Sequence, residues 1–274
     1  MDKLTFIFLA ILLCGSAVGT RPQPRDGRAT LAADGGVCSA VVGVQNYPCN
    51  EHNVTSGDGY ILSLQNIPFG QSGNAGKGQR PPVLLHHGVL TDAVTWLLSP
   101  PEQSLALLLA DNGFDVWLVN ARGTKYSLGH TSLSSNDPAF WDWTWDELVT
   151  YDLPATFQYI YDQTGQKLHY VGHSMGTLIA FAAFPKGQLV DMLRSASMLC
   201  PIAYIGHMTS PLARTGAEKL LAEDVKLLLD NLHDHEQDKL VVEYTENYAH
   251  ADYVMGFNAK QDVYDPLMAF LRLH

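Results

Sequence analysis

Short apolar runs, separated by turn residues and longer mixed segments, recur along most of the chain. A strand with one face in water alternates apolar and polar residues, whereas a strand buried on both faces reads as a continuous apolar run. The runs in this chain are mostly continuous and therefore predict buried strands. These strands are expected at Tyr60–Leu64, Val83–His86, Asp115–Val119, Leu168–Val171, Ala196–Leu199 and Leu240–Tyr244.

Helix-like segments lie between these runs. Thr144 and Glu147 have the spacing of a capping box, and Trp143 and Leu148 stand where a hydrophobic staple would, so a helix is expected from Trp145. Pro154 either kinks this helix or begins a second segment. The expected helices begin near Ser104, Trp145 and Ser174 or cover Gly216–Leu232 and Asp262–Leu273. Strands that alternate with helices predict an α/β fold, a mostly parallel sheet with helices on both faces.

The first twenty residues have the pattern of a secretory signal peptide. Lys3 precedes an apolar run over residues 4–14, and small residues at 17–19 offer a cleavage site after Gly19. The run is too short for a membrane anchor, and the rest of the chain has no apolar run of transmembrane length. We therefore expect a signal peptide at 1–19, a mobile arm at 20–36 and one domain from 37 to 274.

Composition and charge indicate a folded protein that does not bind nucleic acid. The chain has 274 residues, of which 46% are hydrophobic, enough for a sizeable core. Its formal net charge of −11 argues against nucleic acid as a partner, because binding to phosphates needs a basic face. A neutral or apolar substrate remains compatible with this charge.

The cysteines agree with an oxidising compartment. Cys14 leaves with the signal peptide; Cys38 and Cys49 are close enough in sequence to bridge a short loop, and Cys200 follows an apolar run as a buried free thiol would. Asn53 begins the sequence Asn-Val-Thr, which is a glycosylation sequon in a secreted chain.

Gly172-His173-Ser174-Met175-Gly176 matches the nucleophile motif G-x-S-x-G between a predicted strand and a predicted helix. A serine hydroxyl needs a base, and His250, after the last predicted strand, is the candidate. The segment after His87 and Gly88 lies where an oxyanion donor is expected. Val89 and Met175 are the predicted donors of backbone N–H groups, and Leu90 is the neighbouring alternative.

Two groups of histidines are alternative candidates for a metal site. His86 and His87 are adjacent, and neighbouring residues on a strand point to opposite faces, which disfavours joint ligation. His233 and His235 lie in a charged stretch that is more typical of solvated surface. We therefore predict that neither group of histidines binds a metal.

Several stretches together resemble the acid lipase family, which includes gastric and lysosomal acid lipases and, closest in pattern, plant triacylglycerol lipases. The resemblance implies an α/β-hydrolase core, secretion or a lysosomal or vacuolar location, and cofactor-free hydrolysis of acylglycerols and sterol esters. It also implies that Ser174 is the nucleophile and His250 the base. The stretches are Glu51–Thr55, Asp58–Tyr60, His87–Leu90, Asn120–Gly123, Phe140–Glu147, Tyr151–Pro154, Gly172–Gly176 and His250–Tyr253.

The chain departs from the family between Ser174 and His250. The triad order Ser, acid, His requires an acid on a loop after its own strand, and neither that strand nor that loop is found there. A cap, a lid and one strand are expected to be missing near 222–224. Asp224, Asp230 and Asp252 are the carboxylates that could replace the acid.

The sequence thus predicts a secreted serine ester hydrolase that acts on lipid esters or at a lipid–water interface, without nucleic acid and without a transmembrane segment. The alternative is a catalytically impaired or non-catalytic lipid-binding relative, because the loop that carries the acid is absent.

Overall fold

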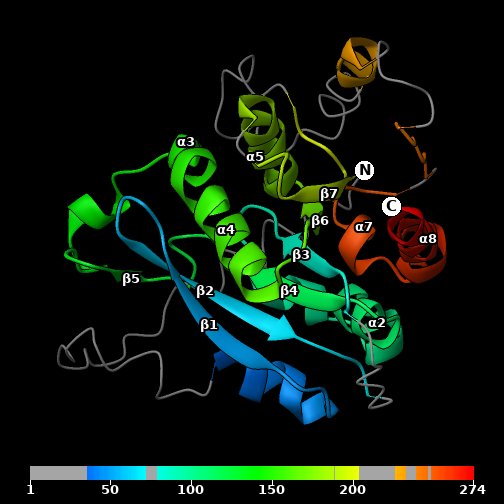
Figure 1. Cartoon of the computed structure of the whole chain (residues 1–274), viewed down its shortest axis with the longest axis horizontal. Coiled ribbons are helices and arrows are strands. Elements are labelled where there is room, and N and C mark those ends of the chain that lie inside the picture. The colour runs from blue at the N-terminus through cyan, green and yellow to red at the C-terminus, as the bar shows by residue number, and fades with distance from the viewer. Residues whose placement is uncertain (1–35, 72–78, 188, 204–225, 233–238, 246–247) are drawn as a thin grey trace, which may run out of the picture. The chain divides into compact units, whose positions relative to one another are not determined.

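A computed structural model describes residues 36–71, 79–187, 189–203, 226–232, 239–245 and 248–274. Within these ranges, seven strands form one sheet in the order β1-β2-β4-β3-β6-β7, and β5 pairs with β2 (Figure 1). The strands are β1 (Asn50–Thr55), β2 (Tyr60–Ile67), β3 (Pro82–His86), β4 (Asp115–Val119), β5 (Gly129–His130), β6 (Leu168–His173) and β7 (Leu193–Leu199).

The sheet is mixed. Strands β4, β3, β6 and β7 run parallel to one another, as the continuous apolar runs predict. Strands β1 and β2 form an antiparallel pair in which Asn50 lies opposite Asn66, and β2 also pairs antiparallel with β4. The polar sequence of β1 gave no sign of a strand, because only Val54 of its six residues is buried.

Helices cover both faces of the sheet. The α-helices are α2 (Leu105–Asp111), α3 (Trp145–Glu147), α4 (Leu153–Thr164), α5 (Met175–Ala183), α7 (Asp252–Met255) and α8 (Asp265–Leu273). Short 3-10 or π-helical turns are η1 (Cys38–Val42), η2 (Gly43–Gln45), η3 (Ala93–Leu97), η4 (Pro101–Gln103), η5 (Pro138–Trp141), η6 (Leu148–Asp152), η7 (Phe184–Lys186) and η9 (Lys260–Tyr264).

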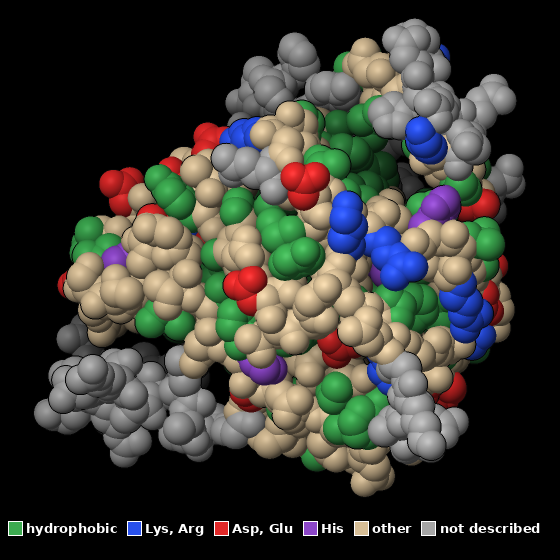
Figure 2. Space-filling view, viewed as in Figure 1, with side chains coloured by type: hydrophobic (Ala, Val, Ile, Leu, Met, Phe, Trp, Pro, Cys, Tyr) green, Lys and Arg blue, Asp and Glu red, His purple; other side chains and the backbone are tan. Residues whose placement is uncertain are grey.

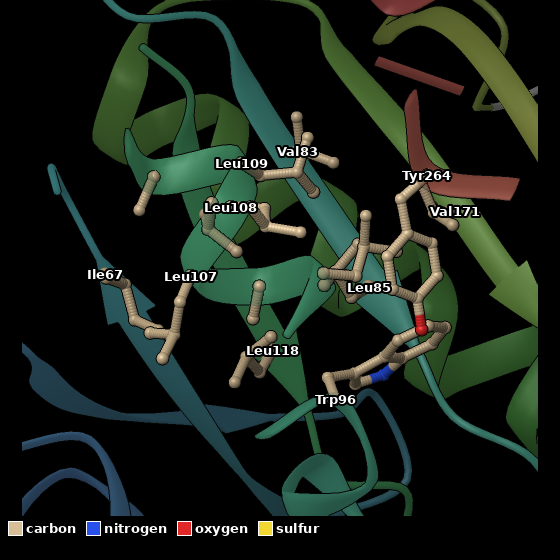
Figure 3. Packing of buried hydrophobic residues seen from close by; sticks show 14 of the residues in the cluster. Ile67, Val83, Leu85, Trp96, Leu107, Leu108, Leu109, Leu118, Val171 and Tyr264 are labelled. Carbon is tan, nitrogen blue, oxygen red and sulfur yellow. The ribbon is translucent and has the colours of Figure 1, made fainter. Parts of the chain in front are cut away.

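Successive residues of a central strand lie in two separate hydrophobic cores, one on each face of the sheet. Val83 and Leu85 of β3 lie in one core with Leu109 of α2, Trp96 of η3 and Tyr264 of η9 (Figure 3). Leu84, between them in sequence, belongs to the opposite core with α4 and α5. Because both faces are covered, strands β3 and β4 are apolar at most positions, which explains their continuous runs.

The start of α3 has the predicted capping box. Thr144 Oγ1 accepts from the backbone N–H of Asp146, and Glu147 accepts from the N–H of Thr144. The π-turn η6 joins α3 to α4, so Pro154 lies in the first turn of a new α-helical segment, where it costs no hydrogen bond. Gly165 ends α4 with φ 65°.

The predicted strand Leu240–Tyr244 is wrong. Residues 239–245 have no regular structure, and Val241, Val242 and Tyr244 are exposed by 56%, 55% and 85%. Within the described residues, β7 ends the sheet and no strand lies beside its outer edge. An apolar sequence without a partner strand has no ladder to join, so its β propensity is not realised.

Other expectations are met or lie outside the described residues. The C-terminal helix is present as η9 and α8, and residues 226–231 of the expected helix Gly216–Leu232 are helical. The signal peptide, the N-terminal arm and the point of deletion near 222–224 lie outside the described residues. Among the helices that the structure describes, none combines the length and apolar character that a membrane span requires.

Candidate active site

The turn between β6 and α5 carries the G-x-S-x-G motif. Ser174 has φ 55° and ψ −114°, a backbone conformation that residues with a side chain rarely adopt. Such strain is found at the strand-to-helix turn that exposes a nucleophilic serine in hydrolases. Ser174 therefore has the backbone geometry that the motif predicts.

The two outer glycines of the motif are required by crowding. A Cβ atom on Gly172 would lie 2.9 Å from the backbone carbon of Gly176. A Cβ atom on Gly176 would lie 2.6 Å from the carbonyl oxygen of His86 in β3. A larger residue at either position would push α5 away from the sheet and distort the turn.

Backbone and side-chain hydrogen bonds tie this turn to β7. The N–H of Ser174 donates to the carbonyl of Leu199 over 3.2 Å. The hydroxyl of Thr177 donates to the carbonyl of Ser174 over 2.6 Å and accepts from the N–H of Ile202 over 2.8 Å. Ser174 is 4% exposed, so the nucleophile candidate is held in a packed setting.

The loop after β3 passes directly beside Ser174. A Cβ atom on Gly88 would lie 3.1 Å from Cβ of Ser174 and 3.5 Å from its Oγ. Met175 directly follows Ser174 and begins α5, and Val89 follows Gly88, the residue that packs on Ser174. Leu90, the alternative, has φ 61° and a side chain that is 92% exposed.

His250 reaches the same edge of the sheet from the C-terminal segment. Its backbone carbonyl accepts a hydrogen bond from Nε2 of His173 over 3.0 Å, and the two rings lie 5.1 Å apart. Its Nδ1 lies 2.8 Å from Sγ of Cys200, the residue directly after β7. Burial lowers the pKa of His250 below its ordinary value and that of His173 to about 4, so both rings are neutral at pH 7.

The three candidate carboxylates do not form the triad in the described part of the chain. Asp224 lies outside the described residues, and Asp230 is exposed. Asp252 accepts from the N–H of Ala249 over 2.8 Å instead. In the ranges described, the group at Nδ1 of His250 is the thiol of Cys200 rather than a carboxylate.

The adjacent pair His86 and His87 is held by hydrogen bonds. Their ring centroids are 5.5 Å apart, so the expectation that they point to opposite faces is wrong, because β3 ends at His86. Nδ1 of His87 donates to the carbonyl of Gly88, and its Nε2 accepts from the N–H of Ala121. Both nitrogens of His87 are therefore engaged without a metal. The pair His233 and His235 lies outside the described residues.

A buried ion network lies beneath the loops around the site. The guanidinium of Arg122 bonds both oxygens of Asp58, at 2.7 and 2.9 Å, and both oxygens of Asp152, at 2.9 and 2.5 Å. It also stacks over the ring of Tyr60 at 3.9 Å. These residues belong to three of the stretches that carry the resemblance, and their role here is to hold the loops after β1 and β4 against α4.

The two carboxyl groups of this network differ in pKa. Burial raises the pKa of Asp152 to about 6, even though Arg122 acts in the opposite direction. Burial also raises the pKa of Asp58, but hydrogen bonds from Arg122 and Ser56 more than offset it and leave the pKa below its ordinary value. The network therefore depends on the positive charge of Arg122.

The predicted modification sites lie near the N-terminal edge of the sheet. Cys38 and Cys49 form a disulfide with Cα atoms 5.2 Å apart, which connects η1 to the residue before β1. Asn53 lies on the edge strand β1 and is exposed. Cys200 is free, as expected, but half-buried rather than buried.

Sequence reasoning missed two partners of His250. Cys200 was interpreted as a core thiol, and His173 only as a variable position of the motif. The signal for Cys200 was its place at the carboxyl end of a parallel strand, the edge where Ser174 lies. Their distances from His250 in sequence, 50 and 77 residues, hide the contacts from any local pattern.

Comparison with known proteins supports the fold. Residues 81–264 match the family model of the alpha/beta hydrolase fold, and residues 38–100 match a partial alpha/beta-hydrolase lipase region. A solved structure from Sulfolobus solfataricus has a TM-score of 0.51 at 14% identity and covers 78% of this chain and 90% of that one, which supports the fold alone.

Curated relatives are similar in sequence. Triacylglycerol lipase 2 of Arabidopsis thaliana is 53% identical over 216 residues, which are 78% of this chain and 50% of the relative. Human lysosomal acid lipase/cholesteryl ester hydrolase is 41% identical over 180 residues, 65% of this chain and 45% of the relative. The chain spans about half the length of the curated relatives it matches. It belongs to the α/β-hydrolase family, within which its curated relatives are triacylglycerol and acid lipases.

Proposed function

We propose that this chain is a secreted serine ester hydrolase of the acid lipase type. It cleaves acylglycerols or related lipid esters through an acyl-enzyme on Ser174, with His250 as the base. The observation that carries the proposal is the strained backbone of Ser174 at the β6–α5 turn, because such strain persists only where the surrounding structure enforces it.

The reaction follows from the groups around Ser174. Oγ of Ser174 attacks the ester carbonyl carbon while Nε2 of His250 takes its proton, since Nδ1 is engaged by Cys200. The tetrahedral intermediate collapses, the alcohol leaves with that proton, and the acyl group stays on Oγ. Water, deprotonated by the same nitrogen, then releases the carboxylic acid and restores Ser174.

The oxyanion of the intermediate needs two donors. The proposal assigns them to the backbone N–H groups of Met175, at the start of α5, and Val89, after the glycine that packs on Ser174. The positive end of the α5 dipole acts at the same place.

An apolar pocket beside α5 supports a lipid ester as the substrate. It has a volume of about 260 Å³ and begins one turn after Ser174, at Leu178. Hydrophobic side chains gather over this part of the surface (Figure 2). An acyl chain is the ligand class that such a lining fits. The pocket is lined by Trp145, Leu178, Phe181, Ala182, Ala203 and Leu228.

The proposal includes the route of the protein. Residues 1–19 act as the signal peptide, 20–36 as an arm and 37–274 as the hydrolase core, and the mature chain is secreted or reaches a lysosome or vacuole. The disulfide Cys38–Cys49 and the exposed sequon at Asn53 fit an oxidising, glycosylating compartment. No cofactor takes part in the proposed reaction.

A second candidate, a catalytically impaired lipid-binding relative, is favoured by one observation. The group at Nδ1 of His250 is a thiol rather than a carboxylate. Replacing the acid of a Ser-His-Asp triad by a neutral group costs about 10⁴-fold in kcat. The apolar pocket beside α5 would serve such a protein equally well.

Covalent labelling with a fluorophosphonate probe separates the two candidates. The secreted, folded chain is expected to become labelled, and Ser174→Ala and His250→Ala are each expected to lose the label. Thermal unfolding of each variant shows whether it is folded. A folded wild-type chain that takes no label supports the lipid-binding candidate, and a label that survives Ser174→Ala overturns Ser174 as the nucleophile.

A further inference from the structure

The ring of His250 is fixed from two sides. The chain before it, residues 239–245, has no regular structure, so no strand positions the histidine. Instead, His173 holds its backbone carbonyl and Cys200 lies at its Nδ1. The first contact places the loop, and the second sets the orientation of the imidazole.

Cys200 lies where an orienting group is needed. It directly follows β7, the parallel neighbour of the strand that carries Ser174, and the carbonyl of Leu199 just before it bonds the N–H of Ser174. Cys200 has φ 48°, so the chain turns sharply at this residue and directs its side chain toward His250. Both catalytic candidates thus contact consecutive residues at the end of one strand.

We propose that Cys200 is a positioning residue that takes the place of the triad acid and accepts a hydrogen bond from the Nδ1–H of His250. The proposal rests on the proposed function and deepens it. With the hydrogen on Nδ1, the lone pair of Nε2 is free to accept the proton of Ser174.

A thiol performs only part of the role of a carboxylate. Burial raises the pKa of Cys200 to about 12, so Sγ stays protonated and uncharged at neutral pH. The other titratable groups facing this pair are His173, whose ring is neutral, and Tyr253, whose own pKa is raised by burial and by Cys200. A neutral acceptor fixes the tautomer of His250 but does not stabilise the imidazolium that forms during attack.

The first test reads the tautomer directly and needs no activity. Long-range ¹H–¹⁵N NMR of the histidine side chains in the full mature chain is expected to show His250 protonated at Nδ1, with the assignment made by His250→Ala. Cys200→Ala is expected to lose this preference. Protonation at Nε2 in the wild type, or a spectrum that Cys200→Ala leaves unchanged, would overturn the proposal.

The second test supplies the missing charge. Cys200→Asp is expected to raise the rate of fluorophosphonate labelling at least about tenfold, toward the roughly 10⁴-fold that an ionised orienting acid provides. It is also expected to raise the pKa of His250 in the pH profile of labelling. Asn258→Asp adds the same charge to an exposed site of the C-terminal segment and serves as the control.

The outcomes of these tests separate the role of Cys200 from the proposed hydrolase function. A labelled wild type whose rate and pH profile are the same in Cys200→Ala and Cys200→Asp overturns the role of Cys200 while the proposed function stands. A wild type and a Cys200→Asp variant that both resist labelling, with His250 still protonated at Nδ1, overturn the proposed function and support Cys200 as the partner of His250.

Discussion

The proposed nucleophile and the proposed base are held by different kinds of structure. Ser174 lies between a central strand and a helix, with two glycines pressed against neighbouring backbone. His250 lies on a segment that the sheet does not hold, and side-chain contacts with His173 and Cys200 fix it. The first region is therefore determined by the fold itself, and the second by two contacts that single substitutions can remove.

Because of this difference, substitutions in the two regions are expected to affect the free energy of unfolding and the reaction differently. Changes around Ser174 are expected to affect both the free energy of unfolding and the reaction, because the turn is part of the core. Changes around His250 are expected to affect the reaction and leave unfolding almost unchanged.

Arg122→Met is expected to destabilise the fold by about 3–5 kcal/mol, because it leaves the buried carboxylate of Asp152 and the half-buried carboxylate of Asp58 without their cationic partner. With Arg122 gone, burial raises the pKa of both Asp58 and Asp152 above their unfolded values, so the remaining stability falls as pH rises through that window. Urea unfolding at pH 5 and pH 7 measures both effects.

Lys125→Met is the matched control for the arginine. Its ammonium is 66% exposed and lies 3.9 Å from Asp92, so its loss is expected to change stability by less than about 0.5 kcal/mol. Equal losses for the two variants would mean that the Arg122 network does not support the core.

Gly176→Ala is expected to cost about 1–3 kcal/mol and to remove most of the labelling of Ser174. The new methyl group would lie 2.6 Å from the carbonyl of His86, so α5 must shift. Gly57→Ala is the control, because its nearest neighbour is the side chain of the exposed Tyr151 at 3.3 Å. A Gly176→Ala variant with normal labelling would contradict the crowding argument.

The rate of ester hydrolysis is expected to depend on pH through His250. Burial lowers its pKa, and the base works only when neutral, so kcat/KM rises with pH through an apparent pKa below 6.5. A profile measured from pH 4 to 8 checks this. An acid limb centred at or above 6.5 would place a carboxylate beside His250 after all.

Val242→Ser is expected to change stability by less than about 0.5 kcal/mol, because Val242 is 55% exposed. The same substitution at Val83, which is fully buried in β3, is expected to cost about 2 kcal/mol or more. Thermal unfolding of both variants tests whether residues 239–245 lie outside the sheet. Similar losses would restore the predicted strand.

Much of the central fold could be predicted from the sequence. Strands β3, β4 and β6 were predicted from short apolar runs, which occur because both faces of the sheet are covered there, and the capping box before α3 is a local signal. The pattern failed where structure depends on a partner. β1 is polar but pairs with β2, whereas Leu240–Tyr244 is apolar and pairs with no described strand.

The site divides in the same way. The motif identifies Ser174 because nucleophile, glycines and helix start are consecutive in the chain. Cys200 meets His250 only after β7 has been placed beside β6, which no local pattern encodes. The same holds for Arg122, whose two carboxylate partners lie 64 and 30 residues away.

The buried histidines set an acid limit on the fold. Burial lowers the pKa of His86 to about 3 and those of His169 and His173 to about 4. Between these values and the ordinary 6.5, the histidines bind protons in the unfolded chain but not in the folded chain, so lowering the pH favours unfolding. A protein with this sheet that works in an acidic compartment therefore needs other sources of stability. A glycan, a lipid or a bound acyl chain that stabilises the folded state would offset the destabilisation caused by proton uptake in the unfolded chain.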